Sequence, residues 1–308
     1  MNTIEPTYPI KPKKWLPFRL RKTLTPYLFI APILVLASLF YLIPILRAFD
    51  LSLKRWLITT GRKPEYIGLD NYSELISDQY FIGSFFHTVH FVLGVVPIGI
   101  CISLGLALLL NLPIRFRAAY RAVFFIPVII PTVVVAMVWS FLFAPYGGVI
   151  NEVLKFIGFQ TTDLLSHPDT AMNGIIVTSL WKAVGFNMVI FLAGLQTIPG
   201  EYYEAAMIDG ANGIARFWHI TLPLLMPTML FAIVIATIGS FQVFTQVFVM
   251  TSGGPAFSTT TLVHFIYLNA FEYFRIGYAS ASAIVLFFVI LILSIIQMWI
   301  LRSGRKGW

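Results

Sequence analysis

The sequence predicts an all-α polytopic membrane protein, on three observations. Hydrophobic residues make up 58% of the 308 residues and charged residues only 11%, and the mean hydropathy is +0.84. A soluble globular domain carries about 25% charged residues, so this chain has too little charge for a surface that faces water. Six apolar segments are long enough to cross a bilayer, and they are apolar on every face instead of alternating like barrel strands. Composition therefore excludes a soluble enzyme, a disordered chain and a DNA-binding domain.

Each of the six segments is expected to form its own membrane-spanning helix. In chain order they are 27–46, 87–110, 122–143, 173–195, 225–249 and 277–301. Each has the roughly 20 residues that a spanning helix needs. In lipid, backbone polar groups can be satisfied only inside helices or closed barrels. No small-residue cleavage site follows the first segment, so we expect a retained helix and not a removed signal sequence.

Individual residues distinguish the second, third and fourth segments. The third contains Pro127 and Pro131, which predict a kink because proline lacks an N–H and clashes with the preceding turn. The fourth holds Lys182, the one charged residue in the six segments. The second carries a stripe of small residues that predicts close packing against another helix. That stripe consists of Gly94, Gly99, Ser103 and Ala107.

The distribution of charge predicts the orientation. With both termini in the cytoplasm, the inside segments hold thirteen Lys and Arg against four Asp and Glu, and the outside segments hold seven against nine. Cytoplasmic loops carry such an excess of basic residues. We therefore expect a multi-pass protein of the cell (inner) membrane, whose net charge of +8 reflects topology and not nucleic-acid binding. Its expected parts are a basic cytoplasmic N-terminus (1–26), a membrane domain (27–301) and a cytoplasmic tail (302–308).

The chain shows no pattern typical of catalysis or metal binding. It has no G-x-x-x-x-G-K-[S/T] phosphate loop, no H-E-x-x-H and no G-x-S-x-G. Ion-coupled transporters usually keep acidic residues within their spans, and the six segments contain no Asp or Glu. We interpret His87, His90 and His264 as interfacial or structural, and Cys101 as a small buried side chain. We expect no catalytic residue, metal or cofactor in this chain, so any ATP must bind to another chain.

The long cytoplasmic connection, 196–224, predicts a docking element. Pro199 and Gly200 end the preceding helix, and Glu201 and Glu204 follow, where the positive end of a short helix favours acids. An ordinary interfacial helix prefers Lys and Arg on its polar face, so the acids favour docking. Small residues, a turn glycine and a second amphipathic stretch follow, before a proline that we expect to open the next span. These are Ala205, Ala206, Gly210, then Phe217, Ile220 and Leu222, then Pro223.

The same connection resembles the signature of permease subunits of ATP-binding-cassette (ABC) importers: E-A-A, three residues, Gly, nine residues, Ile, one residue, Leu-Pro. Every spacing fits from Glu204 to Pro223. Three other stretches resemble the carbohydrate-uptake group of this family: Tyr-Ile-Gly-Leu-Asp-Asn-Tyr at 66–72, Gly-Gly-Pro at 253–255 with three threonines at 259–261, and Gly-Tyr-Ala-Ser-Ala at 277–281. The resemblance covers about residues 25–300. It is similar to the first-named permease of importers for maltose, trehalose or glycerol phosphate.

This resemblance implies a non-catalytic membrane subunit with several partners. In such importers two different permeases pair, two ATPase subunits bind ATP and Mg²⁺, and an extracytoplasmic binding protein delivers the sugar. The E-A-A segment is the coupling helix that inserts into a cleft of one ATPase, with its glutamate paired to a basic residue there. The resemblance assigns this coupling role to Glu204, Ala205, Ala206, Asp209 and Gly210.

The resemblance also places a substrate path near mid-membrane, between the fourth and fifth spans. Sugar recognition uses hydroxyl-bonding side chains and flat aromatic faces. The candidates of these types are Ser179, Trp181, Lys182, Phe186, Asn187, Ser240, Phe241, Gln242 and Gln246. In maltose-uptake members, which are richer in amides there, the sugar-contacting positions correspond to Ser179, Ala183, Phe186, Ser240 and Val243. Spanning glutamines and serines equally serve as contacts between helices.

Two questions stay open at this point. Lys182 either bonds sugar hydroxyls or a phosphate, or it extends to the interface or pairs with the second permease. The whole chain is either an importer permease, a stand-alone ion-coupled transporter or a membrane scaffold. The acidic docking segment favours the importer, since neither alternative needs one.

Overall fold

The computed structural model describes residues 18–158 and 163–303 and divides at Asp50 into two compact units. Most of the predicted cytoplasmic N-terminus (1–17 of 1–26) and of the tail (304–308 of 302–308) lies outside the described residues. The first unit is one helical rod: α1 (Phe18–Ala37), the π-helical turn η1 (Ser38–Leu42) and α2 (Ile43–Ser52), whose end reaches into the second unit. Its apolar stretch runs over Pro26–Ser52, past the predicted 27–46.

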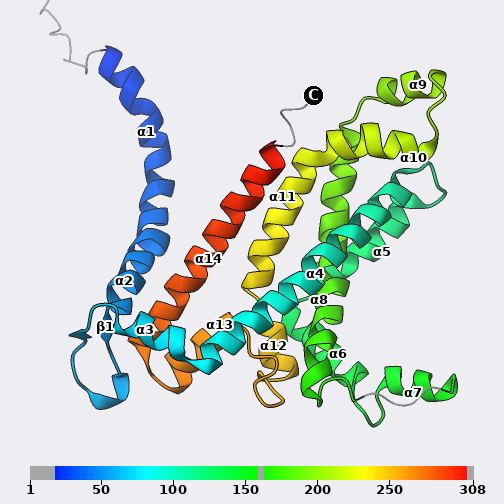
Figure 1. Cartoon of the computed structure of the whole chain (residues 1–308). Coiled ribbons are helices and arrows are strands. Elements are labelled where there is room, and N and C mark those ends of the chain that lie inside the picture. Colours follow the sequence, from blue (N-terminus) through cyan, green and yellow to red (C-terminus); the bar gives the residue numbers. More distant parts are fainter. Residues whose placement is uncertain (1–17, 159–162, 304–308) are drawn as a thin grey trace, which may run out of the picture. The chain divides into compact units, whose positions relative to one another are not determined.

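The second unit is built almost entirely from helices (Figure 1). In chain order the elements are β1 (Lys54–Arg55), η2 (Ile58–Thr60), β2 (Glu65–Tyr66), α3 (Asp70–Ser77), α4 (Gln79–Asn111), α5 (Arg117–Ile129), α6 (Thr132–Leu142), α7 (Val149–Phe156), α8 (Pro168–Gln196), α9 (Gly200–Ile208), α10 (Gly213–Arg216), η3 (Phe217–Thr221), α11 (Leu222–Phe241), α12 (Thr245–Met250), α13 (Leu262–Tyr267), η4 (Leu268–Glu272) and α14 (Ile276–Ser303). The helices α9 and α10 lie at one end of the long helices, and α3, α7 and α12 lie at the opposite end.

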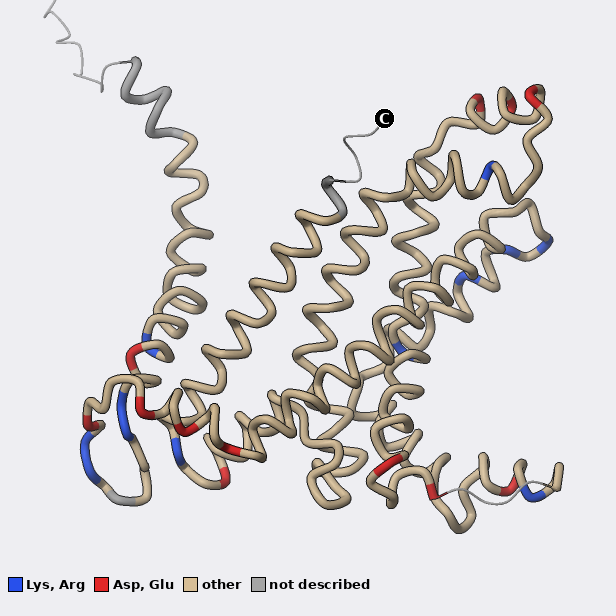
Figure 2. Tube along the Cα trace, in the orientation of Figure 1, with Lys and Arg blue, Asp and Glu red and all other residues tan. Residues whose placement is uncertain are grey.

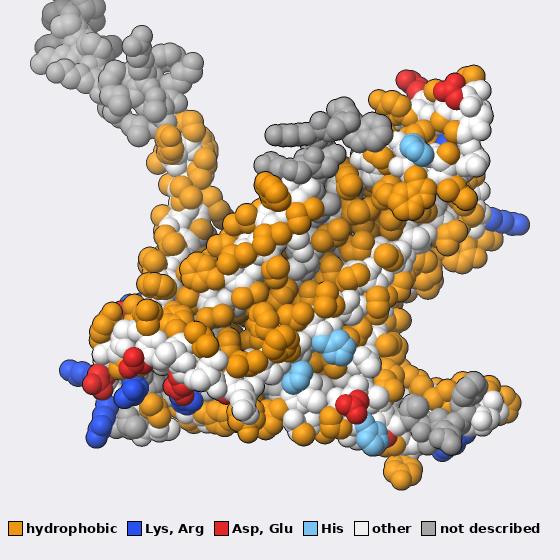
Figure 3. All heavy atoms as spheres, in the orientation of Figure 1, with side chains coloured by type: hydrophobic (Ala, Val, Ile, Leu, Met, Phe, Trp, Pro, Cys, Tyr) orange, Lys and Arg blue, Asp and Glu red, His pale blue; other side chains and the backbone are white. Residues whose placement is uncertain are grey.

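The all-α polytopic prediction is confirmed. Within the described ranges, five helical stretches are long and apolar enough to cross a membrane, and the bent pair α5–α6 makes six if it counts as one span. Hydrophobic side chains cover the middle of the long helices, whereas charged side chains gather toward their ends (Figure 3). This is the surface that a bilayer requires, because charge in the hydrocarbon core is costly.

The core of the second unit is the packing of α4 against α8, and the predicted small-residue stripe forms the contact. A Cβ at Gly94 would lie 2.7 Å from the Ile176 side chain. Nine residues further along α4, the Ser103 hydroxyl donates to the carbonyl of Val184 on α8 at 3.0 Å. Ala107 is fully buried. Small residues let the two backbones approach closely, as expected for helices that pack in lipid.

The third span is broken and not merely kinked. Helix α5 ends at Ile129, α6 begins at Thr132, and the two axes differ by 97°. Pro131 explains the break because it has no N–H to donate to the carbonyl of Pro127. The residue before a proline avoids the helical region, and Ile130 is extended with ψ 133°.

The fifth span starts earlier and ends earlier than predicted. A continuous 29-residue helix runs over Gly213–Phe241, whereas we expected 225–249. Pro223 lies in the first turn of α11, as expected, but α10 and η3 already continue helically before it. It sits inside the helix just after the π-helical turn η3, where the N–H of Leu222 bonds to the carbonyl of Phe217. The wider π turn accommodates a proline that could not make the ordinary bond four residues back.

The stretch 66–72 has a structural task at the α3 end of the unit. Tyr66 belongs to β2, which pairs antiparallel with β1, and Asp70 begins α3. The buried Asn71 amide donates to the carbonyls of Ser52 at 2.7 Å and Lys54 at 3.0 Å. Burying an amide is tolerated when its donors are satisfied in this way.

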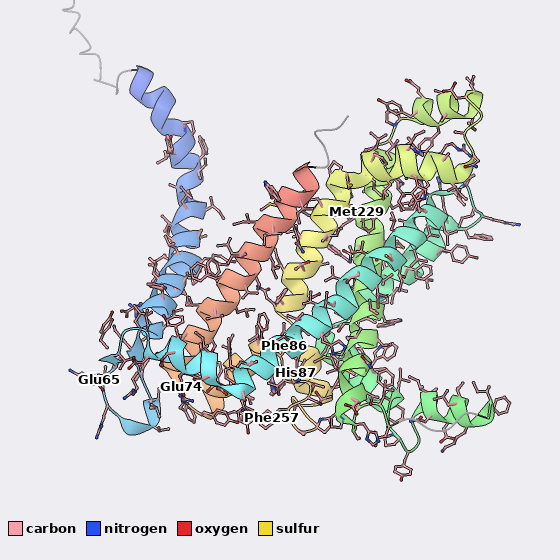
Figure 4. The ribbon with its side chains drawn as sticks, in the orientation of Figure 1. Glu65, Glu74, Phe86, His87, Met229 and Phe257 are labelled. Atoms are coloured by element: carbon pink, nitrogen blue, oxygen red, sulfur yellow. The ribbon has the colours of Figure 1, made fainter. Side chains whose placement is uncertain are left out.

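The last span is fastened to the same region by charged contacts. Arg275 forms an ion pair with Glu74 of α3 and also lies 4.1 Å from the ring centre of Tyr278. The Tyr278 hydroxyl donates to Asp78 at 2.6 Å. Figure 4 labels Glu74 in this region and, further along, His87 of α4 and Phe257 of the 251–261 loop. These contacts tie the start of α14 to α3 and α4.

Candidate functional site

A polar-lined cavity of about 390 Å³ lies between α4, α8 and α11, beside the break in the third span. Its volume lies in the range of sites for small molecules. Three helices supply most of the wall, and the rest comes from the short segment 242–246 after α11 and from Val128 and Thr132 of the third span. This segment is exposed to the cavity because α11 ends at Phe241 and α12 begins only at Thr245.

Seven of the nine predicted path residues line this cavity: Ser179, Lys182, Phe186, Asn187, Ser240, Gln242 and Gln246. Ala183 and Val243, the two other positions inferred from maltose-uptake members, line it as well. The structure does not bring Trp181 and Phe241 to the cavity. The Trp181 ring packs edge-on against Trp139 at 5.8 Å, and Phe241 is buried in the core beside α4 and α14. Contact between the seven residues and a substrate stays a prediction.

The cavity contains hydrogen-bonding capacity that the chain itself leaves unused. Ser179 and Asn187 are each 5% exposed. Among the described residues, the Ser179 hydroxyl has no hydrogen-bond partner. An unpaired buried hydroxyl is costly, so such an atom commonly marks a place where water or a ligand binds.

Several wall residues were not predicted. Phe91 and Val95 come from α4, and Thr245 begins α12. Val128 and Thr132 lie on either side of the break within the third span. The α4 and α12 residues have no polar pattern in the sequence that would identify them. Thr132 could have been found, because it directly follows the proline that breaks the span.

Lys182 bonds to the backbone of the third span, which is neither of the two roles that the sequence left open. Its Nζ donates to the carbonyl of Ile130 at 2.6 Å, with longer contacts of 3.3 Å to Pro127 and 3.4 Å to Val128. Lys182 is also one of the residues that line the cavity.

The loop 251–261, which carries the Gly-Gly-Pro and threonine motif, is held by its own hydroxyl groups. Thr251 and Thr259 share a hydrogen bond of 2.7 Å, and Thr260 donates to the carbonyl of Gly253 at 3.1 Å. Gly253 has φ +81°, and a Cβ there would lie 2.6 Å from His264. Thr261 anchors the loop to the cavity wall by donating to the carbonyl of Val243. The motif therefore fixes a rigid loop behind the 242–246 segment.

His264 is a structural histidine, as predicted. It is 1% exposed and packs among Phe244, Phe248 and Tyr267. Burial lowers the pKa of its imidazole, because removal from water disfavours the charged form. Cys101, in contrast, is exposed within the chain and not buried, and it lies at a second, apolar cavity of about 720 Å³ between α4, α11 and α14.

The predicted coupling residues lie on and just after α9, at the end of the bundle opposite α7 and α12 (Figure 1). Glu204, Ala205 and Asp209 are exposed, and no residue of α9 is buried. Figure 2 shows the acidic residues of α9 as a separate group at this end. Apolar side chains beside them are also exposed, including Ile208 at 87% and Ile214 at 73%. A surface with this composition is suited to contact another protein.

The chain ends α9 as the sequence predicted. Gly210 has φ +78°, the N–H of Ala211 bonds to the carbonyl of Ala206 at 2.8 Å, and the N–H of Gly210 bonds to that of Met207 at 3.1 Å. This pair of bonds is the Schellman motif. Asn212 then caps α10 by accepting from the N–H of Ala215 at 2.8 Å. The turn between the two helices is therefore rigid.

A second tie fixes α9 to the fifth span. The Tyr203 hydroxyl and the Thr221 hydroxyl lie 3.0 Å apart, which joins α9 to η3. Together with the capped turn, this bond makes α9, α10 and the start of α11 one unit. The α9 helix is thus connected to the helix that lines the cavity.

These features define a class: a polytopic helical membrane protein with a polar cavity between its spans and an exposed docking helix at one end. The family model described as "Binding-protein-dependent transport system inner membrane component" matches residues 96–306. The chain belongs to this family of transport permease subunits. The sequence-based recognition of an importer permease is thereby confirmed.

Several curated relatives match along nearly their whole length. The sulfoquinovosyl glycerol transport system permease protein SmoG of Agrobacterium fabrum is 37% identical, over 90% of each chain. The trehalose/maltose transport system permease protein MalF of Thermococcus litoralis is 36% identical, over 91% of this chain and 93% of its own. The sn-glycerol-3-phosphate transport system permease protein UgpA of Yersinia pestis is 33% identical, over 88% and 92%.

A solved structure shows the same fold. It is the crystal structure of a bacterial ABC transporter involved in the import of the acidic polysaccharide alginate. The likeness has a TM-score of 0.80 at 24% identity and covers 92% of this chain and 99% of the other. The arrangement of helices in this protein is thus that of an ABC-transporter membrane subunit.

Proposed function

We propose that this chain is one of two permeases of an ABC importer for a sugar or sugar derivative. A second permease completes the translocation path, and an extracytoplasmic binding protein delivers the substrate. ATP and Mg²⁺ bind two ATPase partners, so this chain is non-catalytic and holds no cofactor of its own. The names of the relatives, which include trehalose, maltose and a sugar glycoside, support this substrate class.

The observation that carries the proposal is the exposed helix α9. It has the signature residues Glu204 to Gly210 on an unburied surface, at the opposite end of the spans from the 251–261 loop. A stand-alone ion-coupled transporter has no use for an acidic docking helix tied to a span. We infer that α9 inserts into one ATPase, where Glu204 pairs with a basic residue and Ala205 permits close approach.

This assignment also sets the orientation. If α9 contacts a cytoplasmic ATPase, then α3, α7 and the 251–261 loop face outward and both termini are cytoplasmic. The charges of the described residues agree with this direction. Arg117 begins α5 and Arg216 ends α10. Figure 2 shows basic residues along both elements near the α9 end, which favours that end as the inside.

The polar cavity is the proposed substrate path. Hydroxyl and amide groups of Ser179, Asn187, Gln242 and Gln246 would bond sugar hydroxyls, and Phe186 would offer an aromatic face. Closure of the ATPase pair on ATP would move α9 and turn the cavity outward. That is gating between two states by differential binding.

One experiment tests the coupling role. Ala205→Leu adds bulk to an exposed position of α9, and Ala119→Leu adds the same bulk to an exposed position near the start of α5. The tagged complex is purified in mild detergent and its partners are identified by mass spectrometry. We expect Ala205→Leu and Glu204→Lys to lose the ATPase subunit while Ala119→Leu retains it. Full retention of an ATPase in both α9 variants, or recovery of the parent chain alone, would contradict the proposal.

A second experiment tests the cavity. Gln246→Ala removes an amide from the cavity wall, whereas Gln297→Ala removes one that bonds to Thr237 at the apolar cavity. Loss of one hydrogen bond to a sugar is worth about 0.5–1.5 kcal/mol, or roughly a twofold to tenfold rise in KM. We expect this rise for Gln246→Ala in uptake of labelled sugar, and an unchanged KM for Gln297→Ala. Equal effects would place the path elsewhere.

A further inference from the structure

The break in the third span leaves backbone carbonyl groups without their helical partners. In a continuous helix, the carbonyl of Pro127 would accept from residue 131, which is a proline without an N–H. The carbonyls of Val128 and Ile130 would accept from Thr132 and residue 134. Both lie in the first turn of α6, beyond the 97° bend. Unsatisfied carbonyl groups in a membrane cost several kcal/mol each.

Lys182 lies where these carbonyl groups converge. Its ammonium group has three N–H donors, and its three contacts are to the carbonyls of Ile130 (2.6 Å), Pro127 (3.3 Å) and Val128 (3.4 Å). The carbonyl end of a helix carries a partial negative charge, which favours a cation. The positive charge and three donors of Lys182 therefore match the partial negative charge and the unpaired carbonyl groups at the end of α5.

A second contact holds α5 close to α8 beside Lys182. Gly185 lies one turn after Lys182 on α8, and a Cβ there would be 2.1 Å from the carbonyl oxygen of Phe124. The backbones of α5 and α8 thus touch at Gly185. This contact brings the carbonyl end of α5 alongside the Lys182 side chain.

We propose that Lys182 is a positioning residue that fixes the broken third span against α8, and that it is not a charge for binding an anionic substrate. Since the donors of Lys182 are directed to the carbonyl groups, the other polar groups of the cavity wall are hydroxyls and amides, set among apolar side chains. The position of the break in turn sets where Thr132 meets the cavity. The inference about substrate charge rests on the proposed function, whereas the inference about the break does not.

The test uses the complete transporter in lipid nanodiscs, with Lys182→Met and Lys182→Arg in a Cys101→Ser, Thr132→Cys background. Labelling of the cysteine at position 132 by a water-soluble maleimide reports the break directly. We expect Lys182→Met to change the labelling rate several-fold, because methionine has a similar length but no donor. Lys182→Arg keeps donors and charge, so its labelling rate should stay near that of the parent.

Transport kinetics separate positioning from substrate binding. For a positioning residue, Lys182→Met lowers the maximal rate for a neutral and an acidic sugar alike and leaves the ratio of their KM values unchanged. A charge-assisted bond to substrate would instead raise KM for the acidic sugar alone, by about tenfold or more. That selective rise, or an unchanged labelling rate in Lys182→Met, would overturn the proposal.

Two further arms keep the result decisive. If Lys182→Met does not assemble, Lys182→Gln replaces it, since the amide retains two donors. A labelling rate for Lys182→Gln that differs from the rates of Lys182→Arg and the parent supports the proposal. A rate equal to that of the parent overturns it. If the complex with Thr132 unaltered transports no sugar, the proposed function fails, yet the labelling comparison still decides whether Lys182 holds the break.

Discussion

Gly185→Ala offers a direct measure of how tightly α5 and α8 are packed. The added Cβ would lie 2.1 Å from the carbonyl oxygen of Phe124 and 3.2 Å from the Cα of Phe125. Both neighbours are backbone atoms, so no side-chain rotation relieves the contact. To reach ordinary contact at 3.4 Å, α5 must move away by about 1.3 Å. The same movement would lengthen the bond between Lys182 and Ile130.

Overpacking of this kind costs about 1–3 kcal/mol. For a large domain, each kcal/mol lowers Tm by roughly 2–4 °C, so we expect Gly185→Ala to unfold roughly 2–12 °C below the parent. Gly105→Ala is the matched control, because Gly105 lies inside α4 with nothing within 4 Å of its Cβ position. There alanine should be neutral or stabilise by up to about 1 kcal/mol. Intrinsic tryptophan fluorescence during heating of the purified complex measures both, and equal melting of the two variants would refute the packing argument.

Other contacts lead to further predictions. Asn71→Ala should lower the free energy of unfolding by about 1–3 kcal/mol, because it removes an amide that satisfies two carbonyl groups. Ser73→Ala, at an exposed position, should change it little, and chemical denaturation in detergent compares the two variants. Gly253→Ala should loosen the 251–261 loop, because φ +81° and a contact of 2.5 Å both oppose a Cβ, and faster proteolysis of the loop would show it. Burial lowers the pKa of His264 below 6.5, so the neutral imidazole is favoured in the fold. Stability should be full above pH 6.5 and fall below it, and a thermal-shift series should show a flatter pH dependence for His264→Asn.

The fold was predictable from the sequence to the extent that composition determines it. Apolar length identified all six spanning segments, and the prolines of the third predicted a bend at the place where the structure breaks this span. The fifth span was placed wrongly, because hydropathy marks the apolar part of a helix and not its first turns. Gly213–Thr221 is amphipathic, and Pro223 reads as a start signal unless the π turn before it is known. That turn depends on packing that no local pattern reveals.

The site was predictable where chemistry and motif coincide. The resemblance placed a substrate path between the fourth and fifth spans, and the polar residues there line the cavity; without the resemblance, serine, asparagine and glutamine in a span equally indicate contacts between helices. Trp181 and Phe241 were included for their ring type, yet each points away from the cavity wall, toward Trp139 and toward the α4 side of the core respectively. The partner of Lys182 could not be found, since backbone carbonyl groups leave no mark in a sequence.

The fifth span can act as a lever, because α11 (Leu222–Phe241) runs from η3, which is tied to α9, to the cavity. Its 20 residues span about 30 Å at 1.5 Å per residue. A tilt of about 5° about its Leu222 end would displace its Phe241 end by about 2.6 Å. The helix stops at Phe241, and the non-helical residues at 242–244 can absorb the rotation before α12 begins. A small movement at the α9 end would thereby change the shape of the cavity, because the non-helical joint lies in the cavity wall.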